Sequence, residues 1–141
     1  MQKEKIPSQE DINKWVSAVL CLFEPNAELT LRIVEKEEIQ SLNSLYRKKD
    51  KPTNVLSFPA ETHIGLTIPL LGDLIICRDV VQEEALEQGK SFEQHFAHMI
   101  IHGCLHLLGY DHIDDAEAEE MEAIEIEVLH TLGYPNPYEL N

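Results

Sequence analysis

The sequence has few positive charges, few cysteines and no long apolar run. Its 141 residues carry 11 lysines and arginines against 26 acids, and the formal net charge of −15 argues against bulk nucleic-acid binding through a broadly basic surface. No stretch approaches the ~18 consecutive apolar residues of a membrane span. The charged residues 1–5 lack the apolar core of a signal peptide. We therefore expect no membrane association, and the length suits a single domain over residues 1–141.

The three cysteines, Cys21, Cys77 and Cys104, are odd in number and far apart, and none forms a CxxC pair. This pattern gives no sign of a disulfide framework. We interpret all three as reduced, buried small residues of a cytosolic protein.

The charges are distributed unevenly. From Ser91 to the end there is no lysine or arginine but there are eleven acids, eight of them within residues 114–127. The preceding 90 residues hold every basic residue, and four of these fall within five positions: Arg47, Lys48, Lys49 and Lys51. An arginine binds phosphate through a rigid two-pronged set of donors. The field of an otherwise acidic chain favours delivery of a phosphodiester to this one loop.

The apolar periodicity predicts the order helix, strand, helix, strand, strand and then three helices. We expect helices at about 8–22, 36–46, 79–88, 91–108 and 116–132, strands at 29–34, 54–58 and 74–77, and a loop at 61–69. This order indicates an α+β fold, in which a small mixed sheet is covered mainly on one side by helices.

Three histidines, His102, His106 and His112, form the most informative motif. Residues at i and i+4 lie about 6 Å apart on one helix face, so the first two imidazoles can reach one cation. Gly109 stands where a helix can end in a left-handed turn, which would bring His112 back to the same ion. Three nitrogen ligands with one vacant position describe a catalytic zinc site better than a structural one.

Two further histidines compete with this set. His98 and His95 lie on the same broad face, but a zinc ion cannot reach three successive helical turns. We interpret both as supporting or packing residues, since a ligating histidine usually gives its other N–H to a nearby acceptor. Asp111 is a candidate acceptor, although it could equally cap the loop. Asp114 and Asp115 resemble the cap of the last helix.

The motif has the histidine and glycine spacing of the metzincin signature H-E-x-x-H-x-x-G-x-x-H. Gly103 occupies the position at which those proteases carry their general-base glutamate. This difference disfavours peptide hydrolysis, and a metzincin-like hydrolase of peptides or esters is kept as the alternative. A glycine within a helix also lets something approach closely, either the sheet or a substrate. A metal that polarises a phosphoryl oxygen or a water, together with Arg47, makes a workable phosphodiesterase.

Three stretches, residues 46–59, 70–78 and 102–112, make the chain resemble the YbeY family of bacterial rRNA maturation factors. The resemblance runs from about residue 6 to residue 138. It implies a metal-dependent, single-strand-specific endoribonuclease that processes the 3′ end of small-subunit rRNA and acts in ribosome quality control in the cytoplasm. It implies zinc at His102, His106 and His112 and a functional arginine at Arg47. The implied fold is α+β, with a mixed, mostly parallel sheet of three to four strands and about five helices.

Family members usually begin with an extra strand, and this chain starts about a dozen residues later than that pattern. Either the sheet lacks an edge strand, or Met1 is not the natural start. Our hypothesis adds that Lys48, Lys49 and Lys51 hold the RNA strand. The expected partners are single-stranded RNA or rRNA and the ribosome or its proteins, with no membrane and no DNA. A further alternative is a non-catalytic, zinc-containing ribosome assembly factor.

Overall fold

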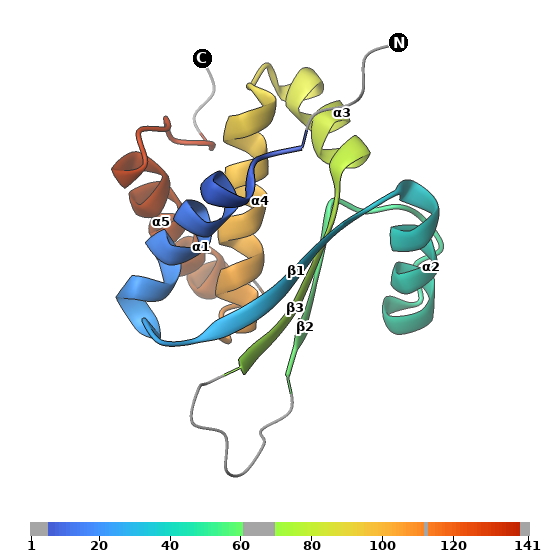
Figure 1. Ribbon diagram of the computed structural model, residues 1–141, viewed down its shortest axis with the longest axis horizontal. Coiled ribbons are helices and arrows are strands. Elements are labelled where there is room, and N and C mark those ends of the chain that lie inside the picture. Colours follow the sequence, from blue (N-terminus) through green and yellow to red (C-terminus); the bar gives the residue numbers. More distant parts are fainter. Residues whose placement is uncertain (1–5, 61–69, 112, 139–141) are drawn as a thin grey trace.

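A computed structural model of the chain describes residues 6–60, 70–111 and 113–138 (Figure 1). Within them, five helices surround a three-stranded sheet, and the α+β class predicted from the sequence is confirmed. The elements in chain order are α1 (Gln9–Phe23), β1 (Glu28–Val34), α2 (Lys36–Arg47), β2 (Val55–Pro59), β3 (Leu70–Cys77), α3 (Arg78–Gln88), α4 (Phe92–Leu107) and α5 (Asp115–Thr131). The loop predicted at 61–69 lies outside the described residues. No helix in the described ranges is long and apolar enough to cross a membrane.

The sheet has the strand order β1-β3-β2 and is mixed. β1 runs parallel to β3, with Leu31 opposite Leu74, and β2 runs antiparallel to β3, with Leu56 opposite Ile75. One of the two pairings is therefore parallel, where the family resemblance implied a mostly parallel sheet. The physical reason is the short connection: only residues 60–69 separate β2 from β3, fewer than a crossover between parallel strands needs.

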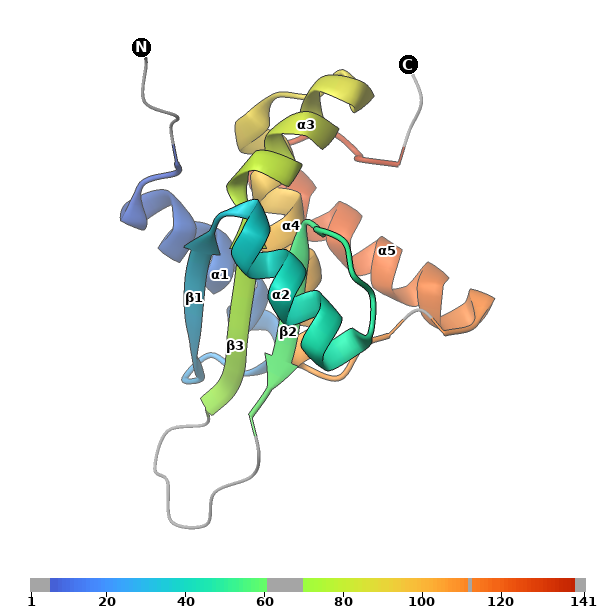
Figure 2. The same ribbon diagram turned by 90° about the vertical axis from the view of Figure 1, so that its right-hand side faces the viewer.

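The two faces of the sheet are covered unequally. Helix α2 lies alone on one face, over a small cluster formed by Val34, Ile39, Leu56, Ile75 and Cys77. The other face carries α1, α4 and α5, and these helices enclose the larger core (Figures 1 and 2). The prediction of a sheet covered mainly on one side is confirmed.

Helix α4 is the most deeply buried helix and lies directly on the sheet. The hydroxyl of Ser91 accepts a hydrogen bond from the backbone N–H of Gln94 at 3.1 Å, which caps the first turn. An ideal Cβ built on Gly103 would stand 2.2 Å from Cδ1 of Leu74, a core residue of β3. The glycine predicted to permit close approach does so, and its neighbour is the sheet. The hydroxyl of Ser57 on β2 donates to the carbonyl of Gly103 at 3.1 Å.

All three cysteines are free thiols. Cys77 and Cys104 are buried as predicted, but Cys21 is exposed, and the expectation was wrong there. The reason is helical geometry, since the preceding residue, Leu20, occupies the inward position of α1.

The packing at Gly103 predicts that Gly103→Ala changes the free energy of unfolding in opposite directions in two backgrounds. In the wild-type protein, we expect Gly103→Ala to lower the free energy of unfolding by about 1 kcal/mol, because the cost of overpacking Leu74 exceeds the gain in helix propensity. In a Leu74→Ala background the methyl group fills vacated space, and the same substitution should be stabilising. Urea unfolding of the four proteins measures both effects. A destabilising Gly103→Ala in both backgrounds would show that the contact with Leu74 is not the cause.

Candidate metal centre and cleft

Four histidines line one face of α4. Their spacing of three or four residues places His95, His98, His102 and His106 on successive turns. The ring centroids are 6.1 Å apart for the first pair, 6.4 Å for the second and 4.6 Å for the third. The closest pair is therefore the one that the sequence predicts to ligate a metal.

The rings of His102 and His106 present the same atom to each other. Their Nε2 atoms are 3.1 Å apart, and the two rings are nearly perpendicular. The Nδ1 of His102 lies 2.8 Å from a carboxylate oxygen of Glu125, and the Nδ1 of His106 lies 3.0 Å from the backbone carbonyl of Tyr110. A carbonyl and an ionised carboxylate only accept, so both Nδ1 atoms are the donors. With the Nδ1 atoms donating, the two Nε2 atoms face each other, an arrangement that favours a cation between them.

The turn after α4 makes one of these contacts possible. Gly109 adopts a φ of 104°, the left-handed region that the sequence predicts at this glycine. The chain reverses there, and the backbone N–H of Tyr110 donates to the carbonyl of Leu105 at 2.9 Å. This reversal brings the carbonyl of Tyr110 to His106.

The donor set fits zinc at the two positions that the structure describes. Two nitrogen ligands of a tetrahedral zinc, each at about 2.0–2.1 Å, lie roughly 3.3 Å apart, close to the observed Nε2 separation. The third predicted ligand, His112, lies outside the described residues. Among residues 6–60, 70–111 and 113–138, no group of three or more His, Cys, Asp or Glu side chains is arranged to hold a metal ion.

Glu125 of α5 is a functional candidate that the sequence reasoning missed. Its side chain is fully buried, and its two oxygens serve different partners. Oε2 accepts from His102, while Oε1 accepts from His98 at 2.6 Å and from the hydroxyl of Tyr138. Burial alone would raise the pKa of this carboxyl, but the hydrogen bonds from the two histidines outweigh it and lower the pKa to about 2. The carboxylate is therefore held ionised beside the predicted metal ligand.

A signal for Glu125 exists in the sequence. The buried apolar residues of α5 are Met121, Val128 and Leu129, and a residue four after the first and three before the second falls on the same stripe. Glu125 occupies that position, and an acid in a core stripe needs a buried partner. The eight acids of this region obscured the signal because most of them are exposed.

A second carboxylate, which is only partly buried, pairs with the first histidine of the row. Glu84 of α3 accepts from Nε2 of His95 at 2.9 Å and from the amide of Asn54 at 3.0 Å. Burial would raise the pKa of Glu84, but these hydrogen bonds lower it below its usual range. His95 and His98 are thus bound to carboxylates of α3 and α5, in keeping with the supporting role predicted for them.

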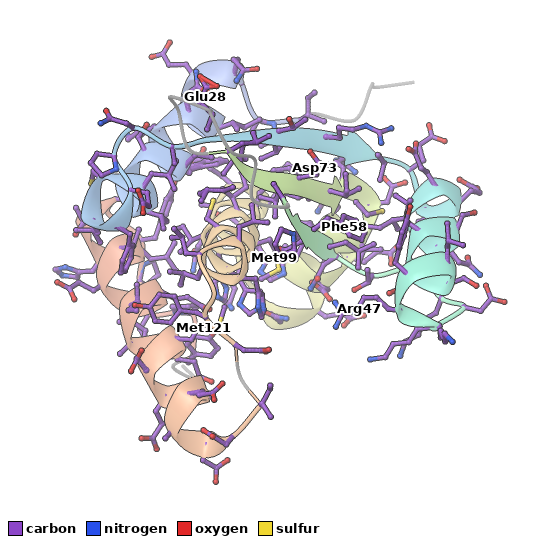
Figure 3. All side chains as sticks on the ribbon, turned by 90° about the horizontal axis from the view of Figure 1, so that it is seen from below. Glu28, Arg47, Phe58, Asp73, Met99 and Met121 are labelled. Carbon is purple, nitrogen blue, oxygen red and sulfur yellow. The ribbon has the colours of Figure 1, made fainter. Side chains whose placement is uncertain are left out.

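A cleft of about 530 Å³ connects the histidine pair with the basic loop. Arg47, the last residue of α2, lines this cleft together with His102 and His106. Figure 3 shows Arg47 between α2 and α4. The remaining walls are residues of the β2 region and of the turn after α4: Thr53, Asn54, Val55, Ser57, Pro59, Gly109, Tyr110 and Asp111. The structure therefore brings a guanidinium and two imidazoles, far apart in sequence, to one cavity.

The three lysines lie beyond this cavity. Lys48 ends α2 in a left-handed conformation, with a φ of 59°, and its backbone N–H donates to Ser44. Lys48, Lys49 and Lys51 are exposed and do not line the cleft. Asp114 caps α5 as predicted, since its carboxylate accepts from the backbone N–H of Glu117 at 2.8 Å.

The depressed pKa of Glu125 predicts that the difference in stability between the wild-type protein and Glu125→Gln depends on pH. In metal-free protein above pH 4.5, we expect Glu125→Gln to lower the free energy of unfolding by about 2–4 kcal/mol, because buried donors lose an ionised acceptor. A carboxyl with a depressed pKa stabilises the fold above its unfolded pKa of 4.5, and this stability is lost as the pH falls toward about 2. The difference between the two proteins should therefore shrink over that window. Urea unfolding at a series of pH values measures it, and a constant difference would contradict the assignment.

Comparison with known proteins identifies the family of the chain. The sequence matches the family described as Endoribonuclease YbeY over residues 1–133. It is also similar to the solution structure of TM1509 from Thermotoga maritima, with a TM-score of 0.59 and 27% sequence identity, over 88% of this chain and 83% of that one. The family match spans nearly the whole chain, and the chain belongs to the YbeY endoribonuclease family.

Proposed function

We propose that the protein is a zinc-dependent endoribonuclease specific for single-stranded RNA, with a zinc ion held by His102, His106 and His112. Family membership supports the general activity, an endoribonuclease that acts in rRNA processing. The observation that supports the zinc site and its use in RNA cleavage is the facing pair of Nε2 atoms, on histidines that line the same cleft as Arg47.

The residues of the cleft would have separate roles in the reaction. Arg47 would bind the scissile phosphate and stabilise the charge that develops on it, through the paired N–H donors of its guanidinium. His102 and His106 would hold the zinc, with Glu125 and the Tyr110 carbonyl keeping their rings oriented. A zinc ion bound there supplies Lewis acidity toward a phosphoryl oxygen or a water molecule.

The basic loop would extend the contact along the RNA strand. Lys48, Lys49 and Lys51 are solvent-exposed, follow Arg47 directly, and belong to the only basic cluster of the sequence. Flexible ammonium groups at such positions suit sequence-independent contacts with phosphates. We assign them strand binding and not catalysis, since they do not line the cleft.

The cellular proposal follows the family. We propose maturation of the 3′ end of small-subunit rRNA and ribosome quality control in the cytoplasm, with the ribosome or its proteins as partners. The alternative of peptide hydrolysis is disfavoured by packing as well as by sequence. Gly103, at the position of the protease glutamate, faces Leu74 with no room for a side chain.

Replacement of one ligand tests the metal site. We expect His106→Ala to lose stoichiometric zinc in elemental analysis of the purified protein, because a two-histidine site lacks a ligand that catalytic zinc requires. His130→Ala is the matched control, since His130 is exposed on α5. Retention of one zinc per chain by a folded His106→Ala protein would contradict the ligand set.

Replacement of Arg47 tests the phosphate contact. We expect Arg47→Ala to reduce kcat for cleavage of a single-stranded RNA by about 10²–10³-fold, with zinc content and circular dichroism unchanged. Arg32→Ala controls for the loss of one positive charge, because Arg32 lies on β1 and pairs with Glu38. Full activity in Arg47→Ala would remove the assigned role.

A further inference from the structure

The chain after α5 turns back along α4 and contributes a tyrosine to the histidine row. The ammonium of Lys90 donates to the carbonyl of Pro137 at 2.9 Å, and the backbone N–H of Tyr138 donates to the side chain of Asn136 at 2.8 Å. The bond from Lys90 ties the segment to the region where α4 begins (Figure 1), and the bond from Tyr138 to Asn136 lies within the segment. Tyr138 thereby reaches a network that begins on a different helix.

The hydroxyl of Tyr138 meets the same carboxylate oxygen as His98. It donates to Oε1 of Glu125, and it lies 3.2 Å from Nε2 of His98, whose ring stands edge-on to the tyrosine. Burial and this hydrogen bond raise the pKa of the Tyr138 hydroxyl, so it stays protonated and remains a donor. Oε1 is therefore held by two donors from two different segments.

The two donors at Oε1 also fix the orientation of the second carboxylate oxygen of Glu125, Oε2. A carboxylate whose Oε1 is fixed by two donors cannot rotate freely, and its Oε2 then points at Nδ1 of His102. The tautomer and the ring orientation of His102 follow from that contact. Tyr138 is not among the residues that line the cleft of Arg47, His102 and His106. Its hydrogen bond to Glu125 is the contact that leads on to His102.

We infer that Tyr138 is a positioning residue for metal binding, which acts through Glu125 on His102. The C-terminal segment thereby sets the affinity of a site that stands on α4. This inference rests on the zinc site proposed above and assigns a role to a residue outside it.

The test compares two tyrosines of the same segment. Tyr138→Phe removes the hydroxyl that reaches Glu125. Tyr134→Phe is the matched control, because its hydroxyl also donates to a carboxylate, Glu93 at 2.6 Å, which lies outside the histidine row. Zinc affinity of the full chain is measured by competition with a fluorescent zinc chelator. In the metal-free protein, ¹⁵N NMR of the histidine rings reports the tautomer of His102.

We expect Tyr138→Phe to bind zinc about 3- to 10-fold more weakly, below the 10–100-fold typical of losing a direct partner of a ligand. The tautomer of His102 should become mixed in this variant, and Tyr134→Phe should match the wild type in both measurements. Unchanged affinity and an unchanged tautomer in Tyr138→Phe, or an equal loss in Tyr134→Phe, would overturn the inference. Wild-type protein without zinc binding would instead overturn the metal proposal together with this inference, so the two failures are distinguishable.

Discussion

The close contact between α4 and the sheet is the constraint on which the site depends. Gly103 lets the helix approach Leu74 to a distance that no side chain would allow, and Ser57 bonds to the carbonyl exposed at that glycine. One end of α4 therefore lies against β2, whose residues form a wall of the cleft. With a wider separation, the histidines of α4 and the guanidinium at the end of α2 would not share one cavity.

Helix α4 also combines two faces that have opposite requirements. One face is apolar and packs into the larger core, with Phe96, Ile100 and Leu105 among its buried residues. The other carries the histidine row, in which buried nitrogens need partners. The neighbouring helices supply carboxylates as partners for Nε2 of His95 and Nε2 of His98, Glu84 from α3 and Glu125 from α5. The Nδ1 atoms of His95 and His98 are buried without a hydrogen-bond partner among the described residues. The first two histidines of the row are therefore part of the interior, whereas His102 and His106 are partly exposed toward the cleft.

Local patterns were enough to predict the elements and the histidine pair. Helical spacing alone places His102 and His106 on one face, and a single glycine marks the turn that follows. The carboxylate partner of His102 could not be predicted, because it depends on which helices become neighbours. Glu125 lies 23 residues from His102, and only the packing of α5 on α4 joins them. The position of Arg47 likewise depends on how α2 crosses the sheet.

The strands also separate into what local sequence patterns predict and what they do not. Their existence follows from apolar runs within each segment, whereas their direction depends on the length of the connections. A connection of ten residues, 60–69, forces β2 and β3 to run antiparallel, and a family-based expectation of mostly parallel strands did not take this into account.

The carboxylates of Glu84 and Glu125 constrain the register in which their helices pack on α4. Glu84 and Glu125 come from different helices, and each meets its histidines at one level of α4. If α5 slid by one turn along α4, the two oxygens of Glu125 would no longer meet His98 and His102 in their present pairing, and a buried carboxylate that loses a partner is costly in a low-dielectric interior. Apolar packing alone tolerates such slippage far better. The polar row therefore acts as an alignment device, which selects one arrangement of α3, α4 and α5 from several that would bury similar apolar area.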